Sequence, residues 1–427
     1  MIWIVPIVAG VLLASGLALA YVIGGAAVLT FVLSDNTRYL AVLPQKVFSQ
    51  ISVFSLLAMP LFILAGELMN RGGVTKSLID LSMALIGRLR GGLGHVNIMT
   101  SVFFAGISGS AVADAAALSN TLVPAMRERG YTAEYAGAIT AASSIIGPIV
   151  PPSIILIFYG ALMQTSVAAL FVAGIMPGLL LAAALFAVNG FFAWRDDHPR
   201  VEKGDAPNLF AAIFAALPAL CLPIIIVGGI ILGWMTPTEA AAVAVLAAVV
   251  AAFFYSPLTL ADIWESFSRT AILTGSIFMI LCAVAAFGHL AALERIPQAI
   301  AGLVDQIGLG PVGFLLVMNL IFILAGMVMD VPVALALLVP LLAPVALANG
   351  ADPVHLGIVI CFNLCIGLVS PPLGGCLLIV STVTGLNYWK LARAVMPFVF
   401  AELIVLGILV FTPEISLWLP RTLGLWK

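Results

Sequence analysis

Charged residues are scarce in this sequence: Asp, Glu, Lys and Arg make up only 8% of its 427 residues. A soluble globular domain usually carries about 25% charged residues. Together with 63% hydrophobic residues and a mean hydropathy of +1.22, this scarcity excludes a soluble domain. The apolar runs are continuous and do not alternate with polar residues, which excludes an outer-membrane β-barrel. The composition therefore predicts an all-α polytopic membrane protein.

Residue patterns typical of metal centres and enzymes are also missing. The five cysteines and four histidines are scattered. Cys361 and Cys365 share a helix face, but no histidine or third thiol accompanies them, so we expect them to serve packing. Without a P-loop, a nucleophile elbow or a His-Glu-x-x-His motif, neither ATP hydrolysis nor proteolysis has support, and we expect no enzyme. The net charge of −2 indicates no particular partner, and no nucleic-acid binding is expected.

Apolar segments long enough to cross a bilayer recur along the chain. A spanning helix needs about 20 apolar residues. The first segment is expected to be a retained span and not a cleaved signal peptide. Two further segments, 74–90 and 295–308, are amphipathic and are expected to lie along an interface. The candidate spans lie near residues 2–33, 47–70, 134–165, 168–194, 209–233, 238–254, 269–290, 354–385 and 388–419.

Two apolar segments are interrupted in the middle by small, polar or acidic residues. Residues 94–126 contain "GISGSAVAD", and residues 311–348 contain "GMVMDVP". Irregular backbone is tolerated at membrane depth only where protein shields it. We therefore predict two re-entrant hairpins.

The two halves of the chain resemble each other at an offset of 220 residues. Pro151-Pro152 falls on Pro371-Pro372, and the hairpin 94–126 falls on the hairpin 311–348. Corresponding spans are separated by an odd number of crossings, so the halves should be inverted in the membrane. The predicted domains are a first repeat (1–208), a connecting span (209–237) and a second repeat (238–427).

Each repeat contains a membrane segment with prolines near its middle. Proline removes a backbone donor and clashes with the preceding turn, at a cost of about 3 kcal/mol. Inverted repeats with broken helices at matching places indicate the midplane site of a secondary transporter. The breaks within 134–165 and 354–385 expose helix N-termini, which favour anions, and carbonyl groups, which can bind sodium ions.

The repeat predicts which residues form the site. An intramembrane carboxylate is a functional candidate, although Asp114 and Asp330 could instead cap helices, and the two roles can coexist. Glu67 and Glu239 lie near span ends, where we expect structural roles, with Glu239 and Thr236 forming a capping box. The predicted sodium ligands are Gly106, Ser108, Ser110, Asp114, Gly147, Gly326, Asp330, Gly367 and Ser370. The predicted substrate contacts are Ser110, Pro151, Pro152, Ser153, Pro371, Pro372 and Leu373.

Lysine and arginine are unevenly distributed over the predicted loops. Twelve of the 17 fall on one side of the predicted topology and five on the other. Cytoplasmic loops carry the excess of positive residues. The loop 195–208 is therefore predicted to be cytoplasmic.

Several longer motifs are more specific than these patterns. They are "MPLFILAGELMNRGG" (59–73), "SGSAVADAAAL" (108–118), "MRERGY" (126–131), "GPIVPPS" (147–153), "WMTPTEAAAVA" (234–244) and "GLVSPPLG" (367–374). Together they resemble the large membrane subunit of tripartite ATP-independent periplasmic (TRAP) transporters over essentially the whole chain.

The resemblance implies an elevator-type fold and sodium-coupled uptake of a carboxylate across the cell inner membrane. It implies two partners, a small four-helix membrane subunit, expected as a separate chain, and a periplasmic substrate-binding protein. It places ion-site residues at Ser108, Ser110, Asp114 and Asp330, and broken helices at 147–153 and 367–373. An alternative function is that of a stand-alone ion-coupled anion transporter or antiporter that needs no binding protein. A passive channel fits poorly, because a continuous pore does not need two inverted hairpins.

Overall fold

The computed structural model describes residues 4–200, 207–308 and 310–427, and these residues form helices without any strand. By length and composition, seven of the described helices could cross a membrane. The seven segments are Phe54–Arg71, Val167–Arg195, Leu209–Ile231, Pro237–Tyr255, Leu260–Leu293, Val331–Ala348 and Tyr388–Phe411. The prediction of an all-α polytopic membrane protein is confirmed.

The first half contains a helix pair followed by a broken helix, as the sequence predicts. The amphipathic segment 74–90 is a helix that packs against α6 and α11. The elements are α4 (Ala58–Arg71), α5 (Val74–Ile86), the hairpin of α6 (Gly92–Ser108) and α7 (Ala111–Glu128), the broken helix of α8 (Ala133–Ser144) and α9 (Ile154–Met163), and α10 (Val167–Arg195).

The second half repeats this order after the connecting helix α11 (Leu209–Ile231). Its hairpin and broken helix again follow one another in the chain. The elements are α12 (Pro237–Tyr255), α13 (Leu260–Leu293), α14 (Ile296–Ile307), the hairpin of α15 (Pro311–Gly326) and α16 (Val331–Ala348), the broken helix of α17 (Pro353–Gly367) and α18 (Gly375–Thr384), α19 (Tyr388–Phe411) and α20 (Glu414–Thr422).

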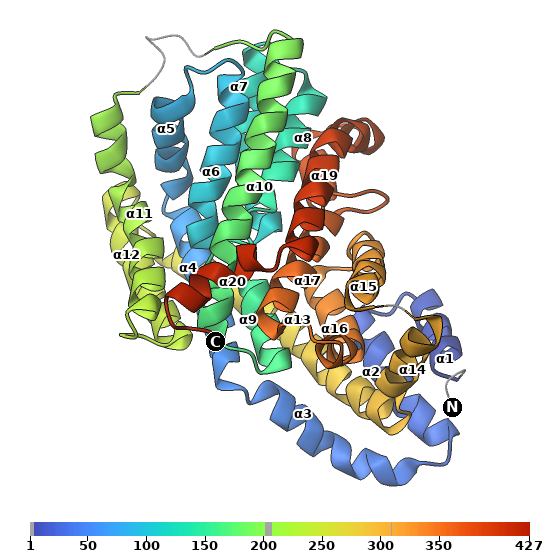
Figure 1. Cartoon of the computed structure of the whole chain (residues 1–427). Helices are drawn as coiled ribbons and strands as arrows, with labels where there is room; N and C mark the ends of the chain where they lie inside the picture. Colours follow the sequence, from blue (N-terminus) through green and yellow to red (C-terminus); the bar gives the residue numbers. More distant parts are fainter. Residues whose placement is uncertain (1–3, 201–206, 309) are drawn as a thin grey trace.

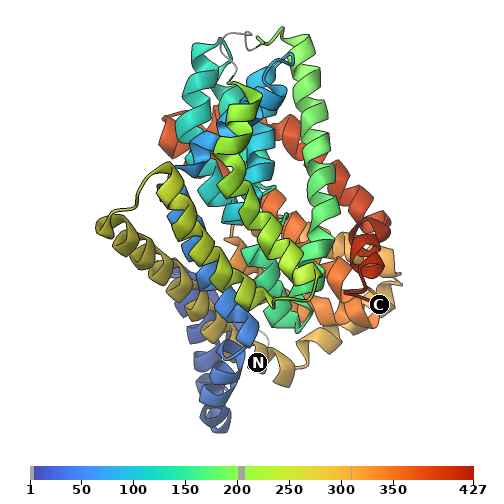
Figure 2. The same cartoon turned by 90° about the vertical axis from the view of Figure 1, so that its left-hand side faces the viewer.

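The helices form two groups. In the outer group, α4 packs against α12 and α13, and α11 packs against α12; α11 and α12 lie together along one edge of Figure 1. In the inner group, each hairpin packs against both broken helices: α7 contacts α8 and α18, and α16 contacts α17 and α9. In Figure 2, α13 runs obliquely beside the N-terminal helices drawn in blue, which it contacts. We call the outer group of α4, α11, α12 and α13 the scaffold and the inner group of hairpins and broken helices the core.

Both helix breaks lie where the prolines predict them. The first break separates Ser144 from Ile154, and Ser153 begins α9 by accepting a hydrogen bond from the Leu156 amide at 3.2 Å. The Ser153 hydroxyl also donates to the Pro148 carbonyl. The second break separates α17 from α18, and α18 starts after Gly374, whose positive φ of 52° favours glycine.

Three predicted spans are not single helices. The segment 2–33 contains α1 (Ile4–Ala14) and α2 (Leu19–Leu33), because Gly16 turns the chain with a φ of 78°. The segment 47–70 contains the end of α3 (Leu43–Ile51), a short turn and α4. The segment 388–419 is divided between α19 and α20 next to Pro413, since the residue before a proline disfavours helix.

Candidate functional site

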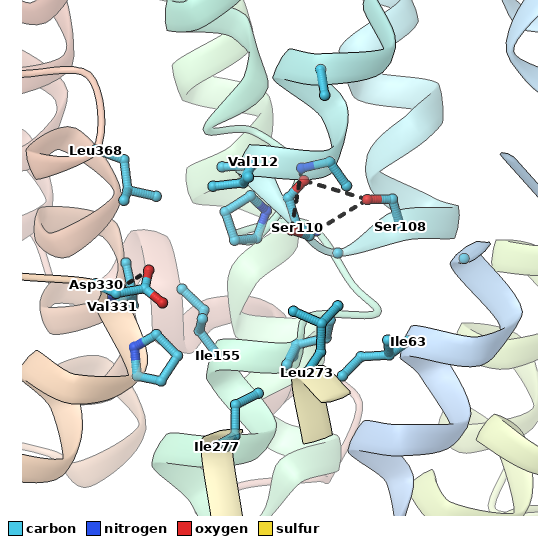
Figure 3. A pocket seen from close by; sticks show the side chains of 18 of the residues that line it. Ile63, Ser108, Ser110, Val112, Ile155, Leu273, Ile277, Asp330, Val331 and Leu368 are labelled. Carbon is cyan, nitrogen blue, oxygen red and sulfur yellow. Dashed lines mark hydrogen bonds between the residues drawn. The ribbon is translucent and has the colours of Figure 1, made fainter. Parts of the chain in front are cut away.

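A cavity of about 400 Å³ lies between the two hairpin tips, the two breaks and the scaffold. Figure 3 shows Ser108 and Ser110 on one side of this cavity and Asp330 on the other, with Leu273 and Ile277 of α13 below them. Pro148 and Leu368 bring both breaks to its wall. Both halves of the chain thus line the cavity, which lies at the contact between the core and the scaffold.

The tip of the first hairpin is held by its own serines. The Ser108 hydroxyl accepts a hydrogen bond from the Ser110 amide at 3.2 Å. Ser110 begins α7 as its N-cap, where its hydroxyl accepts from the Ala113 amide at 3.4 Å. Both serines line the cavity. The N-terminal end of α7, which favours negative charge, therefore faces this space.

The same tip lies directly against the first break. Gly109 has a φ of 61°, and a Cβ atom there would lie 2.5 Å from the Pro152 carbonyl oxygen. Only glycine fits both this conformation and this close approach. The hairpin and the break of the first half are therefore in contact, as the repeat predicts.

Asp114 lies one turn behind the tip and is fully buried. Neither of its carboxylate oxygens has a hydrogen-bond partner among the described residues. A Cβ atom at Gly147 would overlap its Oδ2 atom and lie 3.3 Å from its Cγ atom. The structure thus brings two predicted sodium ligands together at the first break.

The second half shows a similar contact between hairpin and break. A Cβ atom at Gly367 would lie 2.6 Å from the α-carbon of Gly326, so the end of α15 touches the end of α17. Asp330 caps α16, and its Oδ1 atom accepts from the Val331 amide at 3.0 Å. The Ser370 hydroxyl donates to the Ile366 carbonyl at 2.8 Å and is buried in the second break.

Other predicted site residues lie away from the cavity. Gly106 packs against the scaffold, since a Cβ atom there would lie 2.7 Å from Cβ of Pro223 in α11. Of the predicted substrate contacts, only Ser110 lines the cavity. The others stand beside it: Pro151, Pro152 and Ser153 are buried in the first break, Pro371 is half-buried, and Pro372 and Leu373 are exposed.

The sequence analysis missed the scaffold side of the cavity. One face of α4 contributes Glu67 and Asn70, and one face of α13 contributes Ser276. We expected a structural role for Glu67 near the end of its span; α4 turns the face that carries this residue toward the hairpin tip, where it lines the cavity. Glu67 lies three or four residues from Ile63 and Asn70 and next to Gly66, so these residues share one helix face. This spacing could have predicted that they line the cavity together.

A family comparison identifies the class of this protein. The family described as "Tripartite ATP-independent periplasmic transporter, DctM component" matches residues 7–415. The chain belongs to the DctM family. It is therefore a multi-pass membrane permease component of a TRAP transporter, in agreement with the resemblance seen in its motifs.

Curated relatives of this DctM-family protein are transporter permeases and not enzymes. The sialic acid TRAP transporter large permease protein SiaM of Vibrio cholerae is 39% identical over 394 residues, which are 92% of each chain. The C4-dicarboxylate TRAP transporter large permease protein DctM of Pseudomonas aeruginosa is 37% identical over 94% of each chain. The 2,3-diketo-L-gulonate TRAP transporter large permease protein YiaN of Escherichia coli is 34% identical over 95% of each chain.

Two solved transporters share the fold. The YdaH transporter of Alcanivorax borkumensis superposes with a TM-score of 0.65, covering 92% of this chain and 90% of its own, at 14% identity. The MtrF protein of Neisseria gonorrhoeae gives a TM-score of 0.58, covering 90% and 85%, at 13% identity. With the paired hairpins and broken helices, these matches confirm the predicted fold class.

Proposed function

We propose that this DctM-family protein is the large permease of a sodium-coupled TRAP transporter that imports an organic acid anion. The cargo class is a C4-dicarboxylate, sialic acid or a similar carboxylate, as the names of its relatives suggest. A periplasmic binding protein delivers the cargo, and a small four-helix membrane subunit braces the scaffold. The complex lies in the cell inner membrane.

The main observation that supports sodium coupling is the contact of Asp114 with Gly147. An ionised carboxylate buried without a partner is strongly unfavourable. Asp114 has no hydrogen-bond partner among the described residues, and it lies against the first break, where the backbone carbonyls no longer belong to a regular helix. Oxygen atoms of this kind can replace the water around a sodium ion. We therefore assign a first sodium site to Ser108, Asp114 and Gly147.

A second sodium site belongs to the equivalent junction of the second half. The close contact of Gly326 with Gly367 leaves no room for a side chain at either position, so these two residues can offer only backbone oxygens to an ion. Ser370 and Asp330 supply the nearest polar side chains of the two segments. This site corresponds to the first one by the repeat.

The anion is placed in the cavity between the two ion sites. The N-terminal ends of α7 and α9 meet here, capped by Ser110 and Ser153. Such helix ends attract negative charge. The described residues that line the cavity include no Lys, Arg or His, so helix ends and sodium ions replace a basic side chain in binding the cargo.

In the proposed elevator mechanism, the core moves as one block past the scaffold. Glycines lie at the contact of the two groups: Gly66 of α4 faces the backbone of Ser108, and Gly106 faces Pro223. Small residues let helices approach closely without interlocking side chains. The contact thus suits movement of the core.

The proposed orientation places the loop 195–208 in the cytoplasm, although residues 201–206 lie outside the described residues. Arg90 pairs with Asp197 at this end of the molecule, and Arg195 pairs with Asp196. The concentration of basic residues here follows the positive-inside rule.

Uptake into liposomes tests the proposal. The permease and its small subunit are reconstituted, and uptake of radiolabelled sialic acid and succinate is measured with and without a sodium gradient and an added binding protein. Uptake that requires both supports the proposal. Uptake that needs no binding protein supports the stand-alone transporter or antiporter, and uptake that does not depend on sodium contradicts the proposed function.

A further inference from the structure

A carboxyl group is buried inside a membrane helix away from the cavity. Glu402 belongs to α19, one of the helices long enough to cross a membrane, and its side chain is fully buried. Among the described residues, neither of its carboxyl oxygens has a hydrogen-bond partner, and no ion pair includes it. Acidic side chains within membrane helices are rare and usually functional. The proposed function gives Glu402 no role.

The repeat shows that the fold does not require an acid at this position. At the offset of 220 residues, Glu402 of α19 corresponds to Ala182 of α10, which is also buried. Pro397 and Pro177 match at the same offset, so the two helices are aligned in this region. A buried carboxyl group without a partner costs free energy that an apolar side chain does not. Packing alone therefore does not account for Glu402.

The surroundings of Glu402 contain no charge that could compensate an ionised carboxylate. The helices α8, α10, α15, α17 and α18 pack against α19. Their titratable groups close enough to interact electrostatically with Glu402 are two thiols, Cys365 of α17 and Cys376 of α18. Glu134 and Arg195 lie at the ends of α8 and α10, the two basic residues of α19 lie near its N-terminal end, and α15 has no charged residue. Among the described residues, no charged side chain acts electrostatically on Glu402.

A proton is the cation that fits this environment. A buried carboxylate without a partner is strongly unfavourable, so it must bind either a metal ion or a proton. Sodium needs several oxygen ligands, but Glu402 stands in a regular helix, whose carbonyl groups are used within the helix. In the part of the chain that the structure describes, no group of three or more His, Cys, Asp or Glu side chains could hold a metal ion. The neutral acid is the form that remains.

We propose that Glu402 is a proton-binding site of the core and that loss of its proton to water stops transport. This inference goes beyond the proposed function and rests on its elevator movement. Because α19 packs against α8, α17 and α18, it moves with both broken helices. A protonated Glu402 crosses the bilayer without charge. An ionised Glu402 must draw in water, which separates α19 from the helices that form the sodium sites.

Infrared spectroscopy tests whether Glu402 holds a proton. The spectra of the parent permease and of Glu402→Gln in lipid nanodiscs are compared at neutral pH and saturating sodium, which keeps the proposed sodium-binding carboxylates ionised. We expect the parent protein to show the carbonyl band of a protonated carboxylic acid that is absent from Glu402→Gln. Glu128→Gln is the matched control, because Glu128 is exposed at the end of α7 and its replacement should leave this band in place.

The pH dependence of uptake tests what the proton does. In the liposome assay, with equal pH on both sides, sodium-driven uptake of sialic acid and succinate is measured at about pH 7 and about pH 9.5, since buried glutamates lose their protons between these values. We expect uptake by the parent protein to fall about tenfold, because one pH unit above its titration an acid is only about one tenth protonated. The ratio of uptake at the two pH values should change far less in Glu402→Gln. Glu402→Met, an apolar side chain of similar length, should lose the pH response in the same way.

Three results would overturn the inference. They are the absence of a carbonyl band that depends on Glu402, equal pH ratios in the parent protein and both variants, and loss of sodium dependence in Glu402→Gln, which would make Glu402 a sodium ligand. Uptake by the parent protein that does not depend on sodium contradicts the proposed function instead, and the infrared comparison then still decides whether Glu402 holds a proton.

Discussion

The carboxylate of Asp114 lies directly against the α-carbon of Gly147, so that a hairpin helix and a broken helix meet without a side chain between them. Asp114 belongs to the first turn of α7, and Gly147 follows the end of α8. The residue at position 147 must be glycine for the carboxylate to reach the break. This contact is the basis of the proposed sodium site.

A methyl group at Gly147 should therefore disturb sodium binding. In Gly147→Ala, the added Cβ atom overlaps the Asp114 carboxylate and pushes it from the break. We expect sodium affinity to fall about tenfold or more, a loss of about 1.4 kcal/mol. Sodium-dependent uptake in proteoliposomes measures the change. Gly190→Ala is the control, because a Cβ atom at Gly190 meets nothing within 4 Å. Equal sodium affinity in the two variants would contradict the assignment.

Replacing Asp114 and Asp330 by alanine should show which of the two carboxylates binds sodium and which caps a helix. Asp114 makes no capping hydrogen bond, whereas Asp330 caps α16 through the Val331 amide. We expect Asp114→Ala to abolish sodium dependence and Asp330→Ala to lose both sodium affinity and some stability, about 1 kcal/mol for the cap. Sodium titrations and thermal unfolding of each variant measure these effects. Unchanged sodium affinity in both variants would reduce the two residues to structural roles.

The glycine contact in the second half can be tested through the stability of the protein. In Gly367→Ala, the new Cβ atom must lie within 2.6 Å of the α-carbon of Gly326, and backbone atoms cannot move aside easily. We expect the free energy of unfolding to fall by about 1–3 kcal/mol, as in other overpacked sites. Thermal unfolding in detergent measures the loss. Gly407→Ala, where nothing lies within 4 Å of the added atom, should unfold like the parent protein. A normal melting temperature for Gly367→Ala would show that the two helices can separate.

The loop after α10 should respond to pH through His198. Its ring lies 4.7 Å from the rings of both Tyr131 and Tyr135, and burial lowers its pKa below 6.5, assisted by Arg195 and opposed by Asp196. The folded protein therefore favours neutral His198. Stability is complete above the unfolded-state pKa and declines as the pH falls below it. Between about pH 7.5 and about pH 5.5 we expect the melting temperature to fall about 1–2 °C more in the parent protein than in His198→Phe. Identical pH profiles would contradict this role.

The parts of the fold that the sequence predicts are those with strong local signals. Pro151-Pro152 and Pro371-Pro372 cannot continue a helix, so both breaks could be placed within a few residues. The capping box of Thr236 and Glu239 is also confirmed, with the Thr236 amide donating to Glu239 at 2.7 Å. In these cases the local chemistry decides the structure.

The parts that were missed depend on packing between distant elements. Glu67 follows the same helical pattern whether it faces lipid, solvent or the cavity, and only the contact of α4 with the hairpin tip decides between them. The turn at Gly16 was missed because the apolar run continues through it. Pro371, Pro372 and Leu373 were placed in the site by their repeat positions, but the repeat does not determine which face of the break meets the cavity.

Movement of the core past the scaffold can be tested most directly by cross-linking the two groups. A Cβ atom at Gly106 of the first hairpin would lie 2.7 Å from Cβ of Pro223 in the scaffold, and one at Gly72 would lie 3.2 Å from Cβ of Ala252 within the scaffold. Disulfides need Cβ separations of about 3.5–4.5 Å, which small shifts of either pair provide.

The decisive measurement is sodium-driven uptake by the Gly106→Cys/Pro223→Cys and Gly72→Cys/Ala252→Cys variants after oxidation. The parent protein with its five native cysteines receives the same oxidant. The account predicts that the first cross-link stops uptake, that a reductant restores it, and that the second cross-link leaves uptake unchanged. Full uptake with the first cross-link in place would show that the hairpin does not move relative to α11, and would contradict the elevator mechanism.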